Sequence, residues 1–255
     1  MDKNDKSSKG QQGININVLK QGLCTGCSAC VNLCPSMEYY KDKTILLHDC
    51  NLDKGRCFTY CPRAPTDFEM LRRELFDPED MVLELGSFKG LYMTRATNEN
   101  IRTGAQHGGT VTALIQLALA QGIIDEAVLA DNNDLLLPSA QPIADEDEVL
   151  EKARSKFVVS PTVSAFNRIS RAGEGKIGVV ATPCQAQALT KMKVNPVLED
   201  KLRMEKLKLV IGLFCGWALD WRKFQKLMKE KAGDFKIKGM DIPPSNHACM
   251  EVYTI

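Results

Sequence analysis

Seven of the ten cysteines in this 255-residue chain lie between residues 24 and 61. The first four, Cys24, Cys27, Cys30 and Cys34, form the pattern C-x2-C-x2-C-x3-C, and a proline follows the last of them. This run holds a [4Fe–4S] cluster in bacterial ferredoxins, where three thiolates on one tight loop reach three irons. Gly26 and its small neighbours let the backbone wrap closely and point its amides at the sulfides.

The second block of cysteines runs from Cys50 to Cys61 and ends in the same C-x3-C-P pattern, so the two blocks are internal repeats of one unit. In two-cluster ferredoxins the fourth cysteine of a run serves the other cluster. The same crossing here predicts two sets of iron ligands. The first thiol set is Cys24, Cys27, Cys30 and Cys61, and the second thiol set is Cys34, Cys50 and Cys57.

The second thiol set is one thiolate short. A standard repeat would place a cysteine three residues after Cys50, where this chain has Asp53. Three outcomes are open: Asp53 ligates through its carboxylate, a water or an outside residue completes the cluster, or the site holds a three-iron cluster. The simpler alternative is that Asp53 is a loop residue, because Asp favours turns.

A zinc ribbon and a disulfide framework are the alternatives for these cysteines. A ribbon needs two C-x2-C pairs and gives no reason for the third cysteine of the first run. Disulfide scaffolds are typical of small secreted proteins. Residues 1–20 instead begin with a polar run that lacks an apolar export signal, and we expect them to form a disordered tail. We therefore expect reduced, metal-binding cysteines in a cytoplasmic protein.

Charge and hydropathy exclude two further classes of function. The formal net charge is +1, which removes the main argument for nucleic-acid binding. No apolar run approaches the roughly 18–20 residues that a membrane-spanning helix needs.

The region beyond the cysteine-rich segment predicts an α/β fold with a mostly parallel sheet. Continuous apolar runs at 126–130, 176–181 and 207–214 predict buried strands, and helices are expected at 110–121 and 219–231. Cys184 and Cys215 follow two of these strands, and ligands bind beyond the carboxyl ends of parallel strands. The two thiols are thus expected at one edge of the sheet, unless they are ordinary buried cysteines.

Two motifs could bind a phosphate or a flavin. Gly108 and Gly109 precede the helix that begins at Thr110, and glycines at a helix N-terminus expose amides that suit a phosphate. The alternative is a plain helix start. Lys156 and Ser160 stand beside another possible strand, where Lys156 could meet a phosphate or a flavin ring or could simply be solvated.

Several short motifs in chain order make residues 88–253 resemble the coenzyme F420 hydrogenase/dehydrogenase beta-subunit family. The motifs are GGTVTAL at 108–114, GIIDEAVLA at 122–130, SKFVVSP at 155–161, VATPCQAQAL at 180–189 and KLVIGLFC at 208–215. A ferredoxin-like segment at the N-terminus is a frequent companion in this family.

The resemblance implies an iron–sulfur flavoprotein. It implies FAD, with Gly108, Gly109, Thr110, Lys156 and Ser160 around the flavin. It also implies a third [4Fe–4S] cluster, with Cys184 and Cys215 among its ligands. Some members reduce the hydride carrier F420 and others serve hydrogenase or formate dehydrogenase complexes, which implies a redox partner subunit and a small hydride carrier such as F420 or NAD(P)H.

The expected organisation has four parts. A tail covers residues 1–20, a ferredoxin-like α+β segment covers 21–66, a connector with a helix at 67–75 covers 67–87, and the FAD and iron–sulfur domain covers 88–255. Members of the family usually have a later G-C-x2-C segment that this chain lacks, and Cys249 is a poor substitute for it. We therefore expect a chain that is truncated at its C-terminus.

The sequence thus predicts an oxidoreductase subunit that passes electrons between [4Fe–4S] clusters, FAD and a hydride carrier such as F420. It assigns no catalytic side chain. Two alternatives from other classes stay open: a non-enzymatic ferredoxin-type electron carrier without flavin, and a zinc-stabilised interaction module.

Overall fold

The computed structural model describes residues 8–131, 137, 139–197, 200–233, 237–241 and 251–254. Residues 1–7 of the expected tail and Cys249 lie outside the described residues. The helical elements are α1 (Gln11–Ile14), the π-helix η1 (Asn15–Leu19), α2 (Arg56–Thr59), α3 (Phe68–Leu75), the 3-10 helix η2 (Pro78–Asp80), α4 (Glu99–Gly104), α5 (Thr110–Ala120), α6 (Glu148–Glu151), α7 (Thr162–Ala172), α8 (Pro183–Val194), α9 (Lys201–Glu205) and α10 (Trp221–Ala232). The strands are β1 (Met37–Tyr40), β2 (Lys43–Leu46), β3 (Met81–Val82), β4 (Gly86–Ser87), β5 (Glu126–Ala130), β6 (Ala140–Ile143), β7 (Ile177–Ala181), β8 (Leu207–Gly212), β9 (Ile237–Asp241) and β10 (Glu251–Thr254).

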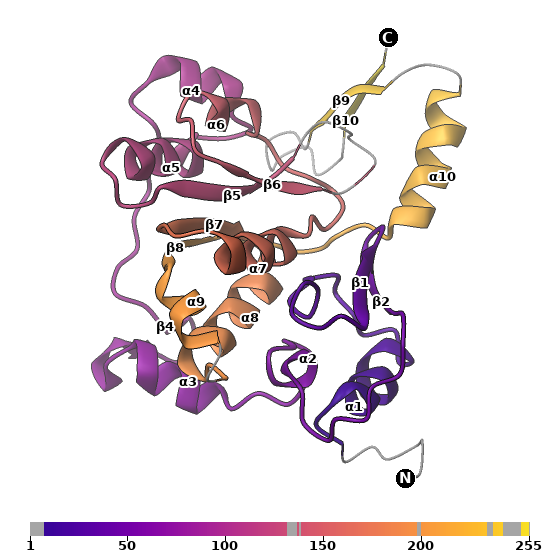
Figure 1. Ribbon diagram of the computed structural model, residues 1–255. Helices are drawn as coiled ribbons and strands as arrows, with labels where there is room; N and C mark the ends of the chain where they lie inside the picture. Colours follow the sequence, from indigo (N-terminus) through magenta and orange to yellow (C-terminus); the bar gives the residue numbers. More distant parts are fainter. Residues whose placement is uncertain are drawn as a thin grey trace.

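The central sheet has four strands in the order β6-β5-β7-β8 (Figure 1). β5, β7 and β8 run parallel to one another, and β6 pairs antiparallel with β5 at one edge. The expected α/β class is confirmed, but the sheet is mixed. The reason is the short link between β5 and β6, because residues 131–139 are too few for the crossover that a parallel neighbour requires.

Helices cover both faces of this sheet. Alternate residues of β5 point to opposite faces, so Val128 packs in one core while Ala127 and Leu129 pack in the other. The first core joins the sheet to α7, α8 and α9. The second core joins it to α5 and α6. The sheet therefore presents one of its ends, rather than a face, to a ligand.

The N-terminal segment is ordered from residue 8 onward, which corrects the expected disordered tail over residues 1–20. α1 and η1 place Ile14 and Val18 one turn apart, and each side chain is only 2% exposed. The Gln11 side chain joins two distant loop positions, because its Nε2 donates to the His48 carbonyl at 2.6 Å and its Oε1 accepts from the Cys50 amide at 2.7 Å. These contacts with residues far along the chain fix the conformation of this segment, although its sequence alone is polar.

The cysteine-rich segment is built around a small core and the β1–β2 hairpin. Ile14, Val18, Met37, Cys57 and Ala64 are buried together. Further cysteine side chains pack against this core, namely Cys24, Cys30, Cys34 and Cys61. The segment therefore gathers its thiols around one centre, although it carries little regular secondary structure.

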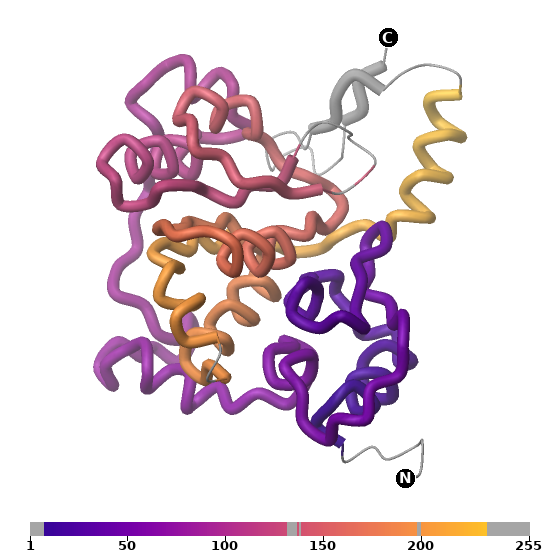
Figure 2. The backbone as a smooth tube through the Cα atoms, in the orientation of Figure 1, coloured from indigo at the N-terminus to yellow at the C-terminus, as the bar shows by residue number. Residues whose placement is uncertain are grey.

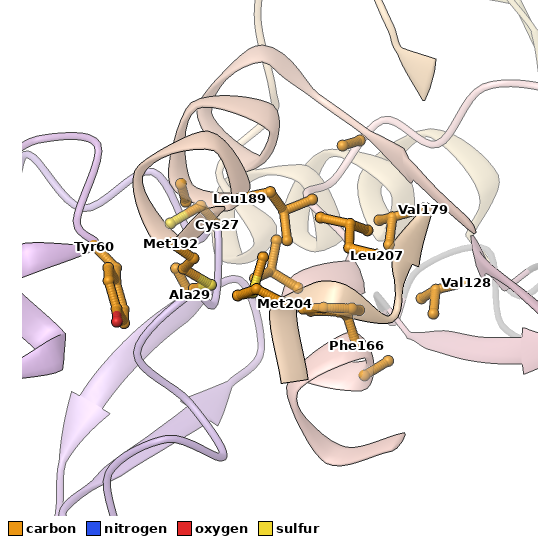
Figure 3. Packing of buried hydrophobic residues seen from close by; sticks show 14 of the residues in the cluster. Cys27, Ala29, Tyr60, Val128, Phe166, Val179, Leu189, Met192, Met204 and Leu207 are labelled. Carbon is orange, nitrogen blue, oxygen red and sulfur yellow. The ribbon is translucent and has the colours of Figure 1, made fainter. Parts of the chain in front are cut away.

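This segment shares the main hydrophobic core with the sheet. Cys27, Ala29, Leu33 and Tyr60 are buried in the same cluster as Phe166 and the side chains of α8 and β7 (Figure 3). Figure 2 shows the segment, in indigo and purple, lying along the orange part of the chain that carries α8 and α9. The expected ferredoxin-like segment is thus packed onto the α/β region instead of hanging from a linker.

Hydrogen bonds reinforce this shared core. Asn167 of α7 is fully buried, and its Nδ2 donates to the carbonyls of Ala29 and Val31 at 3.1 and 2.8 Å. Its Oδ1 accepts from Arg203 Nη1 at 3.0 Å. Ser28 Oγ also accepts from the Ser164 amide at 3.1 Å. The loop that carries the first cysteines is therefore held by the sheet domain.

Replacing Asn167 with Ala should destabilise the protein. The change leaves the carbonyls of Ala29 and Val31 and one Arg203 donor buried without partners, and a buried unpaired group costs about 1–3 kcal/mol. We expect the free energy of unfolding, measured by urea titration, to fall by about 2–4 kcal/mol. Asn100→Ala, at an exposed position of α4, is the matched control. Equal stability of the two variants would contradict this role of Asn167.

Candidate functional site

The thiols of the cysteine-rich segment divide into two neighbourhoods. Burial raises the pKa of Cys27 well above its usual value, and the charges of Cys30, Cys184 and Cys61 add to the rise. Burial also raises the pKa of Cys57 to about 12, and the charges of Cys34 and Cys50 add to it. Cys30 and Cys61 thus act on Cys27, Cys34 and Cys50 act on Cys57, and Cys184 acts on Cys27 from outside the cysteine-rich segment.

The two neighbourhoods adjoin. Burial raises the pKa of Cys30 to about 12, and the charges of Cys24, Cys61 and Cys57 all add to the rise while a hydrogen bond with Thr44 lowers it. Cys57 belongs to the second thiol set, so its effect on the pKa of Cys30 connects the two thiol sets. All nine cysteines in the described part of the chain are free thiols.

The donor set consists of thiols, and thiols fit iron–sulfur clusters because Cys thiolates hold the irons of such clusters. Binding would replace the thiol protons, because the ligands of a metal must be deprotonated. Within the described residues no group of three or more His, Cys, Asp or Glu side chains is close enough to hold a single metal ion.

The loop around the first thiol set is shaped by Gly26. Its φ is +71°, and a Cβ at this position would lie 2.1 Å from the carbonyl oxygen of Asp42. Ser28 and Asn32 also have positive φ, 59° and 60°. Three left-handed residues in quick succession coil the backbone around the cysteines, as the sequence predicts for this loop.

Asp53 lies in the exposed loop between Cys50 and Cys57. Its carbonyl accepts a hydrogen bond from the Lys9 amide at 3.1 Å, so the loop is tied to the N-terminal residues.

Cys184 and Cys215 lie at the same edge of the central sheet, beyond the carboxyl ends of β7 and β8. Cys184 is in the first turn of α8, and its Sγ is 3.3 Å from Thr182 Oγ1. Cys215 is exposed, and its Sγ contacts the Trp217 carbonyl at 3.4 Å. Of the two, Cys184 packs against the core that contains Cys27, a neighbour that the sequence did not predict.

The loop before α5 is hydrogen-bonded to the loop that carries Lys156. Ser155 donates its amide to Gln106 Oε1 at 3.1 Å, and Arg154 Nε donates to the Gly104 carbonyl at 3.3 Å. Gly109, with φ of +75°, begins α5, and a Cβ on it would lie 2.8 Å from Ile101. The chain therefore joins the loop before α5 to the loop that carries Lys156.

The other two glycine-motif residues are fixed by short contacts. The Gly108 carbonyl accepts from the Ala96 amide at 2.7 Å. The hydroxyls of Thr110 and Thr94 are 2.9 Å apart. The N-cap residue of α5 is Gly109, which has no side chain to accept a hydrogen bond from the first amides of the helix.

Lys156 is held over the backbone of its own loop. Its Nζ donates to the carbonyls of Lys152, Ala153 and Arg154 at 3.4, 3.1 and 3.0 Å. Burial lowers the pKa of Lys156 to about 8, although the charge of Asp131 opposes the shift. The simple solvated lysine is therefore the wrong alternative for this residue.

Asp131 is a buried acidic residue near Lys156 that the sequence analysis did not single out. It follows β5 directly, is buried, and forms an ion pair with Lys152 at 3.0 Å. An acidic residue straight after a buried strand was the available signal, because ligand sites gather at that end of a parallel sheet.

Ser160 is buried between the two regions. Its carbonyl accepts from Gln185 Nε2 at 2.6 Å, which ties the lysine loop to the first turn of α8. One residue earlier, the Val159 carbonyl accepts from the Tyr39 hydroxyl at 2.6 Å. The same loop thus touches α8 on one side and the β1–β2 hairpin on the other.

A separate cavity of about 640 Å³ lies between the cysteine-rich segment and the helices α3 and α8. Lys54, Phe58, Met70 and Lys191 are among its lining residues. The residues that the sequence places around a flavin are not among the lining residues of this cavity.

Two protein-family models match the α/β region, and both describe the beta subunit of coenzyme F420 hydrogenase/dehydrogenase. The model of its N-terminal part matches residues 91–167. The model of its C-terminal part matches residues 174–254. Together the two matches cover more than half of the chain.

Curated relatives carry names that involve the same coenzyme. The chain is 25% identical over 239 residues to the coenzyme F420-dependent sulfite reductase of Methanocaldococcus jannaschii, which covers 88% of this chain and 36% of that protein. It is 32% identical over 151 residues to the coenzyme F420 hydrogenase subunit beta of Methanothermobacter thermautotrophicus, which covers 58% of this chain and 53% of that protein. The chain therefore spans about half, or less, of the length of these relatives.

Among solved structures, the chain is similar to one in the xenon-derivatised F420-reducing [NiFe] hydrogenase complex from Methanosarcina barkeri. The TM-score is 0.56 at 26% identity, and the match covers 71% of this chain and 60% of that chain. None of the helices in the described part of our chain is long and apolar enough to cross a membrane.

Two glycines with similar backbone angles test the shape of the cysteine loop. Gly22 has φ of +68° and open space around a Cβ, whereas a Cβ on Gly26 would meet the Asp42 carbonyl. Gly22→Ala should cost only the strain of a left-handed residue, about 1–2 kcal/mol. Gly26→Ala should in addition displace the loop and lower the iron bound per chain. Equal iron contents in the two variants, measured after anaerobic purification, would contradict the role of Gly26.

Proposed function

Because this chain belongs to the coenzyme F420 hydrogenase/dehydrogenase beta subunit family, we propose that it is an electron-transferring subunit of an F420-linked oxidoreductase. The family membership confirms the resemblance noted in the sequence motifs. One observation carries the proposal beyond the family: the loop with Lys156 and Ser160 is hydrogen-bonded both to α8, which begins beside Cys184, and to the hairpin of the cysteine-rich segment. A flavin site and an iron–sulfur site on these residues would be neighbours in one rigid body.

The residues that would hold each group are those described above. Gly108, Gly109, Thr110, Lys156 and Ser160 would surround FAD, and the two thiol sets would hold two [4Fe–4S] clusters, the second of them atypical. Cys184 and Cys215 would be two ligands of a third cluster. Bound together, the flavin would exchange a hydride and the clusters would exchange single electrons.

The protein would contribute binding, orientation and electrostatics to this exchange. The amides at the N-terminus of α5 would favour an anionic group. The ammonium of Lys156 would add a positive charge beside it. The buried hydrogen bonds of Asn167 would fix the distance between the cysteine loop and the sheet edge.

The partners follow from the same proposal. The hydride carrier would be F420 or a nicotinamide cofactor, and a second subunit of the hydrogenase or formate dehydrogenase type would exchange electrons with the cysteine-rich segment. The carrier could approach the exposed end of the sheet near Cys215, while the two thiol sets lie in the cysteine-rich segment beside α8.

The most informative experiment counts iron, acid-labile sulfide and flavin in anaerobically purified protein. About eight irons with one flavin per chain would support two clusters in the cysteine-rich segment, and about twelve would add the third cluster. Eight irons without flavin would instead support a ferredoxin-type electron carrier. Zinc without sulfide would support an interaction module and would overturn the proposal.

Changing Cys27 to Ser should separate the two kinds of site. We expect the variant to lose the visible absorbance of the first cluster and the transfer of electrons to a one-electron acceptor, while FAD stays bound. Cys27→Ala, which preserves an apolar side chain in the buried core, should behave in the same way. Loss of FAD with the clusters intact would contradict the assignment of separate sites.

The affinity for FAD should depend on pH through Lys156. Its pKa is about 8, so the ammonium loses its proton, and the anionic group loses its partner, as the pH rises through that value. We expect FAD binding, followed by flavin fluorescence, to weaken above about pH 8. Lys156→Met should bind FAD several-fold more weakly below that pH, because the change removes the positive charge beside the anionic group.

The Lys156→Met variant should also lose the pH dependence of binding. Lys193→Met, at an exposed position of α8, is the control and should keep the behaviour of the unchanged protein. An affinity that stays constant between about pH 7 and 9 in the unchanged protein would show that Lys156 does not face the flavin.

A further inference from the structure

A buried lysine of the sheet domain contacts the first thiol set. Lys191 lies on α8 and is only 8% exposed. Its Nζ donates to the carbonyl of Cys61 at 2.7 Å and to Thr66 Oγ1 at 3.1 Å. The Cys61 carbonyl belongs to a residue that the spacing assigns to the first cluster, so the ammonium is anchored at the edge of that site.

The charge of Lys191 has no carboxylate partner within the described residues. The ion pairs of the described chain involve other lysines and arginines. The printed contacts of its Nζ are instead the Cys61 carbonyl and the Thr66 hydroxyl. A buried cation therefore lies against a member of the first thiol set.

We propose that Lys191 is a positioning residue whose fixed positive charge raises the reduction potential of the first cluster. When that cluster accepts one electron, from reduced flavin or from a partner, its negative charge increases by one. No bond forms or breaks, and Lys191 keeps its proton throughout. A buried cation at hydrogen-bonding distance from a ligand residue stabilises the more negative state, because Coulomb interactions are strong away from water.

The effect should favour the first cluster over the second. Lys191 donates a hydrogen bond to Cys61, which the spacing assigns to the first thiol set. Lys191 would thus separate the potentials of two otherwise similar sites and give electrons a preferred direction between them.

The inference rests on the proposed iron–sulfur function and is tested on the full-length holoprotein. Potentiometric titration with mediators, followed by electron paramagnetic resonance, would measure the potential of each cluster. Lys191→Gln keeps a donor for the Cys61 carbonyl without the charge, Lys191→Met removes both, and Lys191→Arg keeps the charge. The same titration in a Cys50→Ser background would assign the signal of the first cluster.

We expect Lys191→Gln and Lys191→Met to shift the ratio of oxidised to reduced first cluster roughly tenfold toward oxidised at a given applied potential. This shift corresponds to a potential about 59 mV lower for a one-electron couple. Lys191→Arg should stay close to the unchanged protein. Lys206→Met is the matched control, because Lys206 also donates to backbone carbonyls, those of Ser170 and Gly173, which belong to neither thiol set.

An unchanged potential in Lys191→Gln, with normal iron content, would overturn the proposal and leave Lys191 as a structural tie for the Cys61 loop. An equal shift in both clusters would overturn its selectivity. Protein that contains no acid-labile sulfide at all would overturn the iron–sulfur function itself, and the two failures are therefore distinguishable.

Discussion

The burial of the cysteine loop's backbone against α7 is the constraint on which the rest of the structure depends. Carbonyl groups removed from water must find a donor, and those of Ala29 and Val31 find the same one, the side-chain amide of Asn167. Arg203 holds that amide from the other side. Because these hydrogen-bonding groups are paired in one arrangement, the cysteine loop has one position relative to the sheet. The α/β core therefore also fixes the position of the thiols.

The helix α8 connects the candidate site at the end of the sheet with the candidate site at the first thiol set. Its first turn carries Cys184 and Gln185 at the end of the sheet, and its later turns carry Lys191 beside Cys61. A helix of this length spans about 18 Å at 1.5 Å per residue, so the two sites are separated by no more than a few turns. Any change in the orientation of α8 would alter both sites together.

The sequence predicted the features that depend on neighbouring residues. The cysteine spacing is itself a local pattern. Local patterns also predict the buried strands β5, β7 and β8 and the helix that begins at Thr110. The helix Phe68–Leu75 begins where expected because Asp67 accepts from the Met70 amide.

The features that the sequence missed depend on contacts between distant segments. Residues 11–19 become helical because Gln11 binds loop residues near Cys50, β6 turns back because its link is short, and Cys184 meets Cys27 across the shared core. In the sequence, Lys191 cannot be distinguished from other helical lysines. Only the fold brings it into contact with Cys61.

The burial of Cys27 has a consequence for how the protein matures in the cell. This thiol is 8% exposed and lies within the core that joins the two regions. On the proposed function, a scaffold protein that delivers a cluster can reach it only while that core is still open, so delivery must precede the last step of folding.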